Sequence, residues 1–175
     1  VFEVTGEGYR PEGRFYKIIA GDHTLDDPMN QERVEINPLQ KPATDLLLRA
    51  AALCNDATLE PSGEVNGGAT WRMVGDPTEG ALIVAAIKGG MRQDQLAGIL
   101  PRVAEVPFDS ERKCMSTVHE IRKGKLTERM RDNLLAVLEA KHIPMREDQT
   151  FYVVYVKGAP DIIIDQCGYI YREGR

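Results

Sequence analysis

Apolar and polar residues alternate in several short runs along this 175-residue chain. Alternation of this kind is typical of half-buried β-strands, and a continuous apolar run is typical of a buried one. We therefore predict a buried strand over residues 151–156 and a short final strand over residues 169–171. The other predicted strands cover residues 1–5, 14–19, 71–74, 103–106 and 114–121.

Other segments carry apolar residues at helical spacing. The second helix has the clearest ends, because Asp76 can cap it, Pro77 suits the first helical position, and Gly89 with Gly90 can end it. The predicted helices cover residues 44–55, 77–88, 93–100, 127–142 and 161–166.

Two passages lack either pattern. Residues 20–41 are polar and mixed, which predicts a loop, and residues 61–68 are rich in proline and glycine, which predicts turns. The order of strands and helices is mixed and does not alternate as in βαβ units. This order favours an α+β fold with an antiparallel sheet, and the length suits a single domain over residues 1–175.

Composition narrows the class of protein. Hydrophobic residues make up 42% and charged residues 28%, enough for a real core, and the net charge of −5 argues against nucleic acid as the main partner. No apolar run is long enough for a membrane helix, and the first residues do not resemble a signal peptide. Cys54, Cys114 and Cys167 are widely spaced, which predicts buried thiols rather than disulfides or a zinc site.

Common catalytic motifs are missing from the sequence. The glycines match neither a GxxxxGK[ST] phosphate loop nor the GxGxxG spacing, and no serine or cysteine lies in a nucleophile-elbow sequence. The His119-Glu120 pair is not followed by a second histidine at metalloprotease spacing. We therefore do not expect an enzyme that acts alone through familiar machinery.

Three segments would make sense together around a nucleotide: residues 75–82, 107–113 and 156–160. In the first, Glu79 is either a capping-box residue that reaches back to the backbone of Asp76 or part of a binding site. In the second, Phe108 either folds into the core or stacks on a planar base while Lys113 meets phosphate or ribose.

The third segment places Lys157 at the end of an apolar run. This side chain either extends to water or points into a cleft. In the second case, Gly158 would let a ligand approach the backbone closely.

The stretches GDPTEGAL, PFDSERKCMS and YVKGAPDIIIDQC, in this order and at these separations, resemble the nucleotide-binding domain of cation-transporting P-type ATPases. The stretches FEVTG, YRPEG and ALCND look like the calcium-pump branch of that family. The resemblance covers nearly the whole chain.

The resemblance implies an antiparallel sheet flanked by helices, in a cytoplasmic domain of an integral membrane pump. It places Glu79 near the adenine amino group and Phe108 against adenine, with Lys113 and Lys157 lining the pocket. Together with Ser110 and Gly158, these are the predicted cofactor-binding residues; no catalytic residue and no metal ligand is predicted. The expected ligand is ATP with Mg²⁺ carried on its phosphates.

The expected function is to present the γ-phosphate of ATP to the phosphorylation domain of the same polypeptide, which also carries a membrane domain that transports Ca²⁺. The complete pump would be the enzyme, and this domain alone would be inactive, without contact to nucleic acid or to the membrane. The alternative is a non-catalytic α+β interaction domain with no nucleotide site.

Two departures from the family pattern bear on these expectations. Ser110 stands where animal calcium pumps often have an arginine that contacts the triphosphate. The phosphorylated DKTGT sequence and membrane helices are not among these residues, and the family domain usually continues beyond Arg175 with a further phosphate-contacting arginine. We therefore expect an excised, C-terminally shortened fragment of a pump.

Overall fold

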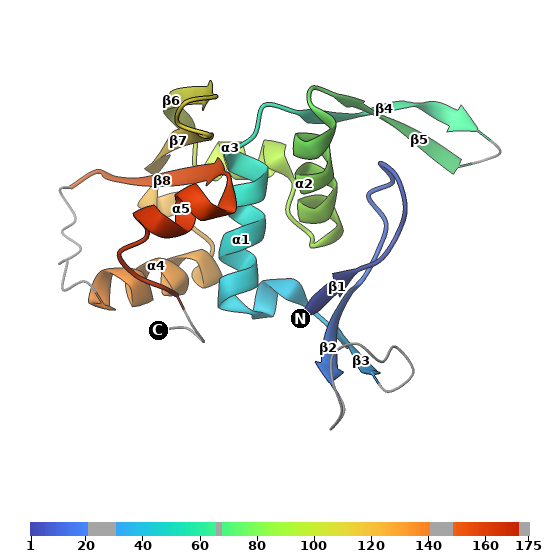
Figure 1. Cartoon of the computed structure of the whole chain (residues 1–175), viewed down its shortest axis with the longest axis horizontal. Helices are drawn as coiled ribbons and strands as arrows, with labels where there is room; N and C mark the ends of the chain where they lie inside the picture. The colour runs from blue at the N-terminus through green and yellow to red at the C-terminus, as the bar shows by residue number, and fades with distance from the viewer. Residues whose placement is uncertain (21–30, 66–67, 141–148, 172–175) are drawn as a thin grey trace.

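The computed structural model describes residues 1–20, 31–65, 68–140 and 149–171. Its strands pair only with antiparallel neighbours and lie beside helices, which confirms the predicted α+β class (Figure 1). The strands are β1 (Phe2–Val4), β2 (Phe15–Ala20), β3 (Gln31–Ile36), β4 (Thr58–Val65), β5 (Gly68–Val74), β6 (Arg102–Asp109), β7 (Cys114–Ile121) and β8 (Phe151–Gly158). The helices are α1 (Pro42–Leu53), α2 (Pro77–Lys88), α3 (Gln93–Ile99), α4 (Glu128–Ala140) and α5 (Pro160–Gln166), with 3-10 turns η2 (Pro38–Gln40) and η3 (Lys123–Lys125).

The strands form three sheets, with the orders β1-β2-β3, β4-β5 and β6-β7-β8. Helix α1 lies in the middle of the molecule, where it packs against α2, α3 and β8 (Figure 1). The β4–β5 hairpin projects away from this centre. Helix α1 therefore sets the distance between the start of α2 and the end of β8, the two elements on which the site described below is built.

The core is centred on the inner face of α1. Leu48 and Ala52 are four residues apart, so they lie on one helix face, and both are buried together with Leu53. Full burial of a leucine side chain contributes about 1.5–3 kcal/mol. The same buried cluster includes Phe15, Cys54, Ala86, Met91, Leu96, Leu100, Met115, Ile121, Leu126, Met130 and Tyr155.

Two strands lie where the sequence pattern indicates loops. Residues 31–36, expected to belong to a loop, form β3 and pair with β2, and their exposed charges form ion pairs (Arg33 with Glu3, Glu35 with Arg14). Residues 61–65, expected to form turns, belong to β4, whose pairing shifts register between Pro61 and Gly63. The turn prediction was therefore wrong there. Proline and glycine suggested a turn, but a bulge can accommodate both residues within a strand.

Two further predictions differ from the structure, and part of a third lies outside the described residues. Strand β8 is not fully buried: Tyr155 is buried, but Tyr152 and Val154, which point to the opposite face of the strand, are more than half exposed. Residues 169–171 form no strand. Helix α4 is described over Glu128–Ala140, and the expected continuation through His142 lies outside the described residues.

Among the described residues, no helix combines the length and the apolar character that a membrane crossing requires.

Candidate functional site

A pocket of about 480 Å³ lies between the first turn of α2, strand β6 and the end of β8. This volume is in the range of small-molecule sites. The pocket brings together residues that are far apart in the sequence. Its lining consists of Asp76, Thr78, Glu79, Leu82, Phe108, Lys157 and Gly158.

The first turn of α2 is held by Asp76, as the sequence predicts. Its carboxylate accepts hydrogen bonds from the backbone N–H groups of Thr78 (2.8 Å) and Glu79 (3.2 Å), and Pro77 occupies the first helical position. The N–H groups of Glu79 and Thr78 lower the pKa of Asp76, because they stabilise its charged form. Asp76 is therefore a charged cap at the rim of the pocket.

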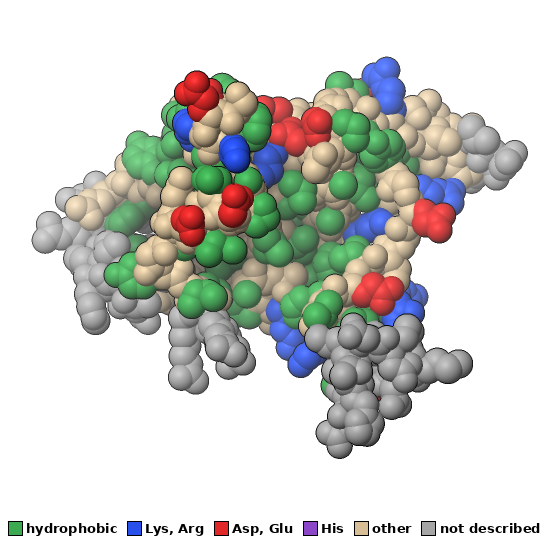
Figure 2. All heavy atoms as spheres, in the orientation of Figure 1, with side chains coloured by type: hydrophobic (Ala, Val, Ile, Leu, Met, Phe, Trp, Pro, Cys, Tyr) green, Lys and Arg blue, Asp and Glu red, His purple; other side chains and the backbone are tan. Residues whose placement is uncertain are grey.

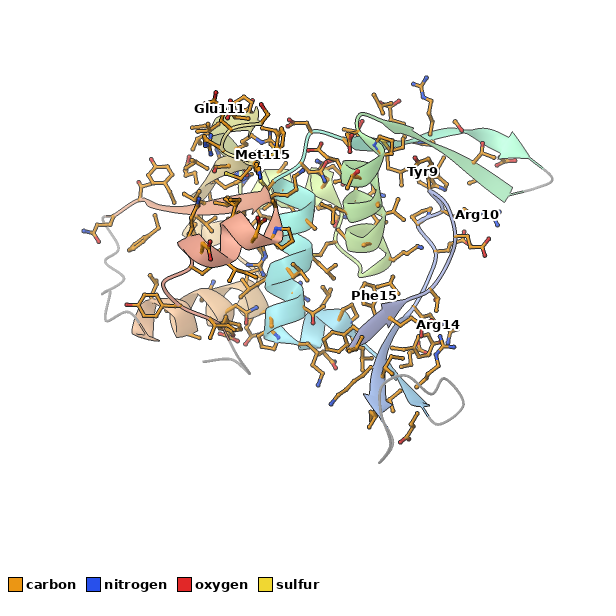
Figure 3. All side chains as sticks on the ribbon, in the orientation of Figure 1. Tyr9, Arg10, Arg14, Phe15, Glu111 and Met115 are labelled. Carbon is orange, nitrogen blue, oxygen red and sulfur yellow. The ribbon has the colours of Figure 1, made fainter. Side chains whose placement is uncertain are left out.

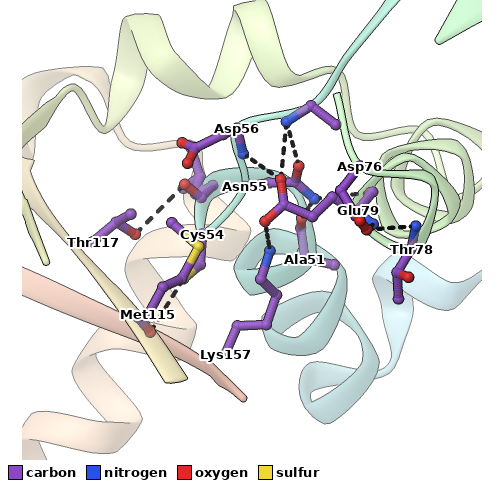
Figure 4. A network of polar contacts seen from close by, with 12 residues as sticks. Ala51, Cys54, Asn55, Asp56, Asp76, Thr78, Glu79, Met115, Thr117 and Lys157 are labelled. Carbon is purple, nitrogen blue, oxygen red and sulfur yellow. Dashed lines mark hydrogen bonds and ion pairs between the residues drawn. The ribbon is translucent and has the colours of Figure 1, made fainter. Parts of the chain in front are cut away.

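The Glu79 side chain does not complete a capping box with Asp76, so the capping-box interpretation is wrong. Its carboxylate crosses to the segment after α1, where Oε2 accepts hydrogen bonds from the backbone N–H groups of Asp56 (3.0 Å) and Ala57 (3.2 Å) (Figure 4). Oε1 accepts from Lys157 Nζ at 2.5 Å. The carboxylate is thus held by three donors from two other segments.

Lys157 does not extend freely to water. It lies late in β8, and its Nζ is ion-paired with Glu79, with the two side chains 25% and 19% exposed. Partial burial makes such a pair less screened than a surface ion pair. The structure therefore agrees with the cleft interpretation of Lys157. The ion pair between Lys157 and Glu79, both of which line the pocket, joins β8 to α2.

Phe108 is 64% exposed, so the interpretation that it folds into the core is wrong. It lies in β6, in the stretch between Val106 and Asp109 where the pairing with β7 is irregular. An exposed aromatic ring on a pocket wall is a large apolar surface that a flat ligand can cover. This arrangement leaves the stacking role open to Phe108.

Ser110 and Lys113 do not line this pocket. Both are exposed in the turn between β6 and β7, where Asp109 Oδ1 accepts from the backbone N–H groups of Glu111 (2.9 Å) and Arg112 (2.8 Å). Figure 3 shows Glu111 at the tip of this hairpin, away from Met115 on β7. Of the six predicted site residues, the structure gathers Glu79, Phe108, Lys157 and Gly158 around the pocket and leaves the other two on the hairpin turn.

Gly158 lines the pocket, but its lack of a side chain has a reason within the chain itself. A Cβ at this position would lie 2.4 Å from the carbonyl oxygen of Lys113 and 2.5 Å from Cys114 Cβ. The same Lys113 carbonyl accepts a hydrogen bond from the N–H of Ala159 at 3.0 Å. Gly158 therefore allows β8 to dock closely on the β6–β7 hairpin, a role that the sequence did not indicate.

The sequence interpretation missed the group of residues that holds Glu79. The stretch ALCND drew attention only as part of the resemblance, yet Asp56 and the following Ala57 supply two of the three donors to the Glu79 carboxylate. Arg102 braces this segment, donating to the carbonyls of Asn55 (2.6 Å) and Leu53 (3.1 Å) and to Asp56 Oδ1 (2.7 Å). An asparagine after an apolar helix was the one available signal, and it also fits an ordinary helix end.

The buried thiol beneath this segment is not suited to chemistry. Cys54 is 1% exposed, and burial raises the pKa of its thiol, which disfavours the reactive thiolate. Among the described residues, no group of three histidine, cysteine, aspartate or glutamate side chains could hold a metal ion. The pocket can therefore bind a ligand through its shape, an aromatic ring and a few charges.

A neighbouring groove lacks this combination of groups. A groove of about 350 Å³ between α1, β8 and α5 is mainly apolar, and Figure 2 shows hydrophobic side chains gathered over the centre of the same face. Its single charged lining residue among those described is Lys157, which it shares with the Glu79 pocket. We take the pocket at Glu79 as the candidate site, because four of the six residues predicted from the sequence line it.

The sequence of this chain is similar to a known protein family and to several known proteins. Residues 43–175 match the family model described as "P-type ATPase, cytoplasmic domain N". The chain is 38% identical over 164 residues, 94% of its length, to the probable cation-transporting ATPase F of Mycobacterium bovis. It is 30% identical to the calcium-transporting ATPase of Bacillus subtilis over 174 residues, 99% of this chain. It is 32% identical to calcium-transporting ATPase 1 of Lactococcus lactis over 141 residues, 81% of this chain.

These matches cover 12–14% of the length of the three relatives. The aligned part contains all the residues around the pocket, since the family model begins at residue 43 and extends to residue 175. A match over this much of the chain, together with several relatives of at least 30% identity, confirms the resemblance seen in the sequence. The chain belongs to the family of cytoplasmic N domains of P-type ATPases.

Proposed function

We propose that this domain binds ATP in the Glu79 pocket and, within a longer cation pump, presents the γ-phosphate to the phosphorylation domain of the same polypeptide. The observation that carries the proposal is the convergence of Glu79, Phe108 and Lys157 from three distant segments on one pocket of about 480 Å³. The relatives are named as cation- and calcium-transporting ATPases, which supports a role in ATP-driven transport.

The lining suits an adenine base better than it suits phosphate. Phe108 offers an exposed ring for stacking, and the Glu79 carboxylate offers oxygen atoms that accept hydrogen bonds from an amino group. The charged lining residues Asp76, Glu79 and Lys157 carry a net negative charge, which would repel a triphosphate. We therefore orient the base inward and the phosphates toward solvent, with Mg²⁺ bound to the phosphates.

Ser110, Lys113 and Gly158 have different parts in this proposal. Gly158 borders the base site, whereas Ser110 and Lys113, on the turn that follows Phe108, would meet only the ribose or the phosphates. A serine there offers no positive charge. Binding energy should thus come mainly from the base.

Catalysis would belong to the complete pump, with this domain contributing by positioning, which can supply about 7–11 kcal/mol of barrier reduction in well-oriented reactions. The pump would transport a cation, Ca²⁺ by analogy with its relatives, through a membrane domain. The isolated 175-residue chain should neither hydrolyse ATP nor become phosphorylated.

Calorimetric titration of the chain with ATP, ADP and AMP tests the proposal. We expect similar dissociation constants on the order of 0.1–1 mM for all three, because the base supplies most of the contacts. AMP binding a hundredfold more weakly than ATP would contradict the base-inward orientation. No binding of any adenine nucleotide would instead favour a non-catalytic interaction domain, and turnover by the purified chain would refute the assignment of catalysis to other domains.

A further inference from the structure

We propose that Asn55 is a positioning residue for nucleotide selectivity: it sets the orientation of the Glu79 carboxylate and thereby the preference for a 6-amino over a 6-oxo purine. This inference rests on the proposed function. Asn55 itself is 1% exposed and is not among the residues that line the pocket, so it would act only through Glu79.

The Asn55 side chain contacts both the backbone of Glu79 and one of the groups that donate to its carboxylate. Its Nδ2 donates to the backbone carbonyl of Glu79 and to that of Ala51, each at 3.0 Å. Its Oδ1 accepts from the N–H of Ala57 at 2.9 Å, and this same N–H also donates to Glu79 Oε2 at 3.2 Å. Asn55 therefore places the backbone of Glu79 and one of the donors to its carboxylate (Figure 4).

The orientation of the Asn55 amide follows from its partners. Two carbonyl oxygens face Nδ2 and one N–H faces Oδ1, so the flipped amide would meet three repulsive contacts. The segment is held from its other side by Arg102, which donates to the Asn55 carbonyl oxygen at 2.6 Å. Buried and satisfied at each polar atom of its side chain, Asn55 can hold only one arrangement.

The consequence for a ligand lies in the acceptor capacity of Glu79. An ionised carboxylate has about four acceptor sites. Among the described residues, Asp56 and Ala57 occupy two sites on Oε2 and Lys157 occupies one on Oε1, which leaves one on Oε1 beside the pocket. That remaining site can accept from the amino group of adenine, whereas it would repel the carbonyl oxygen that inosine carries at the same position.

Anchoring Oε2 is what directs this single acceptor. If the Ala57 N–H moves, Oε2 keeps only the Asp56 N–H, so the carboxylate is held less tightly about its last bond and its directional match to an amino group weakens. The carboxylate would still pair with Lys157, so the pocket would persist. Loss of Asn55 should therefore reduce discrimination between bases more than it reduces binding of nucleotides in general.

The test compares ATP with inosine triphosphate (ITP) in calorimetric titrations of the 175-residue chain. We expect the wild type to prefer ATP by about tenfold or more, as sites that pair with a polar group reject an analogue that lacks it. Asn55→Ala should reduce this ratio by about three- to tenfold, chiefly through weaker ATP binding. A misplaced buried acceptor loses one hydrogen bond to the ligand, and the loss of one hydrogen bond weakens binding by about this factor. If Asn55→Ala does not fold, Asn55→Ser provides the same test with a smaller expected change.

A matched control separates positioning from general destabilisation. Thr117 is also fully buried and its Oγ1 approaches the Leu53 carbonyl at the end of α1 (3.5 Å), but no described contact joins it to Glu79. Thr117→Val should lower the melting temperature and leave the ATP:ITP ratio within about twofold, because the described contacts of the Thr117 hydroxyl, to Leu53 and His119, include neither Glu79 nor a donor to its carboxylate.

A double-mutant cycle then identifies the route of the effect. In a Glu79→Ala background, Asn55→Ala should leave ATP affinity unchanged, since its target is gone. An equal loss of ATP and ITP affinity, additive effects in the cycle, or a wild type without preference for ATP over ITP would each overturn the inference while ATP binding stands. A wild type that binds neither nucleotide would overturn the proposed function, and the inference with it.

Discussion

The two walls of the pocket are built in opposite ways. The α2 wall (Asp76, Thr78, Glu79 and Leu82) has its carboxylates held by backbone N–H groups and by Lys157, with Glu79 only 19% exposed. The hairpin wall consists of Phe108, whose ring is 64% exposed; the 109–113 turn beside it carries exposed side chains and lies outside the pocket lining.

This difference separates orientation from affinity. The α2 wall is already in place before a ligand arrives, so it can impose a directional preference without further ordering. The hairpin wall has apolar surface that becomes buried only when a ligand covers it, so its contribution appears as binding energy. Changes in the α2 wall should therefore affect stability and selectivity, and changes in the hairpin wall should affect affinity alone.

The largest effect is expected where the hairpin wall is anchored. Gly158→Ala would place a Cβ 2.4 Å from the backbone oxygen of Lys113, so β8 or the hairpin must shift. We expect the free energy of unfolding to fall by about 1–3 kcal/mol, as in other overpacked sites, and nucleotide binding to weaken as well. Chemical denaturation and calorimetry would measure the two effects.

Gly98→Ala is the matched control for this substitution. Apart from its chain neighbours and the backbone of its own helix, no atom lies within 4 Å of the position of its Cβ, and Gly98 belongs to α3, so alanine should stabilise the protein slightly. Equal stability of the Gly158→Ala variant and the wild type would show that the hairpin adapts freely and that β8 is not tightly docked on it at this point.

A smaller effect, confined to affinity, is expected at the hairpin wall itself. Phe108→Ala should weaken ATP, ADP and AMP alike by about ten- to a hundredfold, because base–aromatic stacking contributes roughly 1–3 kcal/mol. The melting temperature should not change, since the ring is mostly exposed. Tyr152→Ala removes an exposed ring that lies on β8, and it should leave both the nucleotide affinities and the melting temperature unchanged. A sharply lower melting temperature with unchanged binding would instead make Phe108 a core residue.

The smallest effect is expected at the tip of the hairpin. Ser110→Arg should tighten ATP binding several-fold and AMP binding hardly at all, because a guanidinium group presents a charged fork to phosphate oxygens. The gain should shrink as salt is raised. Glu111→Gln makes the same change in net charge in the same turn without adding a fork. An equal change for AMP and ATP, or an equal gain from Glu111→Gln, would show that residue 110 makes no specific phosphate contact.

Some features of the fold could be predicted because their causes are local. The Asp76 cap, with Pro77 after it and Gly89 at the helix end, determines α2 within one stretch of sequence. The strands β2, β7 and β8 follow from runs of apolar and β-branched residues. By contrast, β3 is charged and exposed, and it is a strand only because β2 lies beside it.

The site shows the same division. The sequence by itself determined which segments carry Glu79, Phe108 and Lys157, and that Asp76 begins a helix. Only the tertiary structure decided what Glu79 does: three residues from a cap, its carboxylate fits a local capping box equally well. It reaches Asp56 and Ala57 because α1 packs against α2 and brings their backbone N–H groups, more than twenty residues away in sequence, within hydrogen-bond distance. A pattern in one segment cannot contain that information, because the competing partner belongs to another segment and is present only once the core has formed.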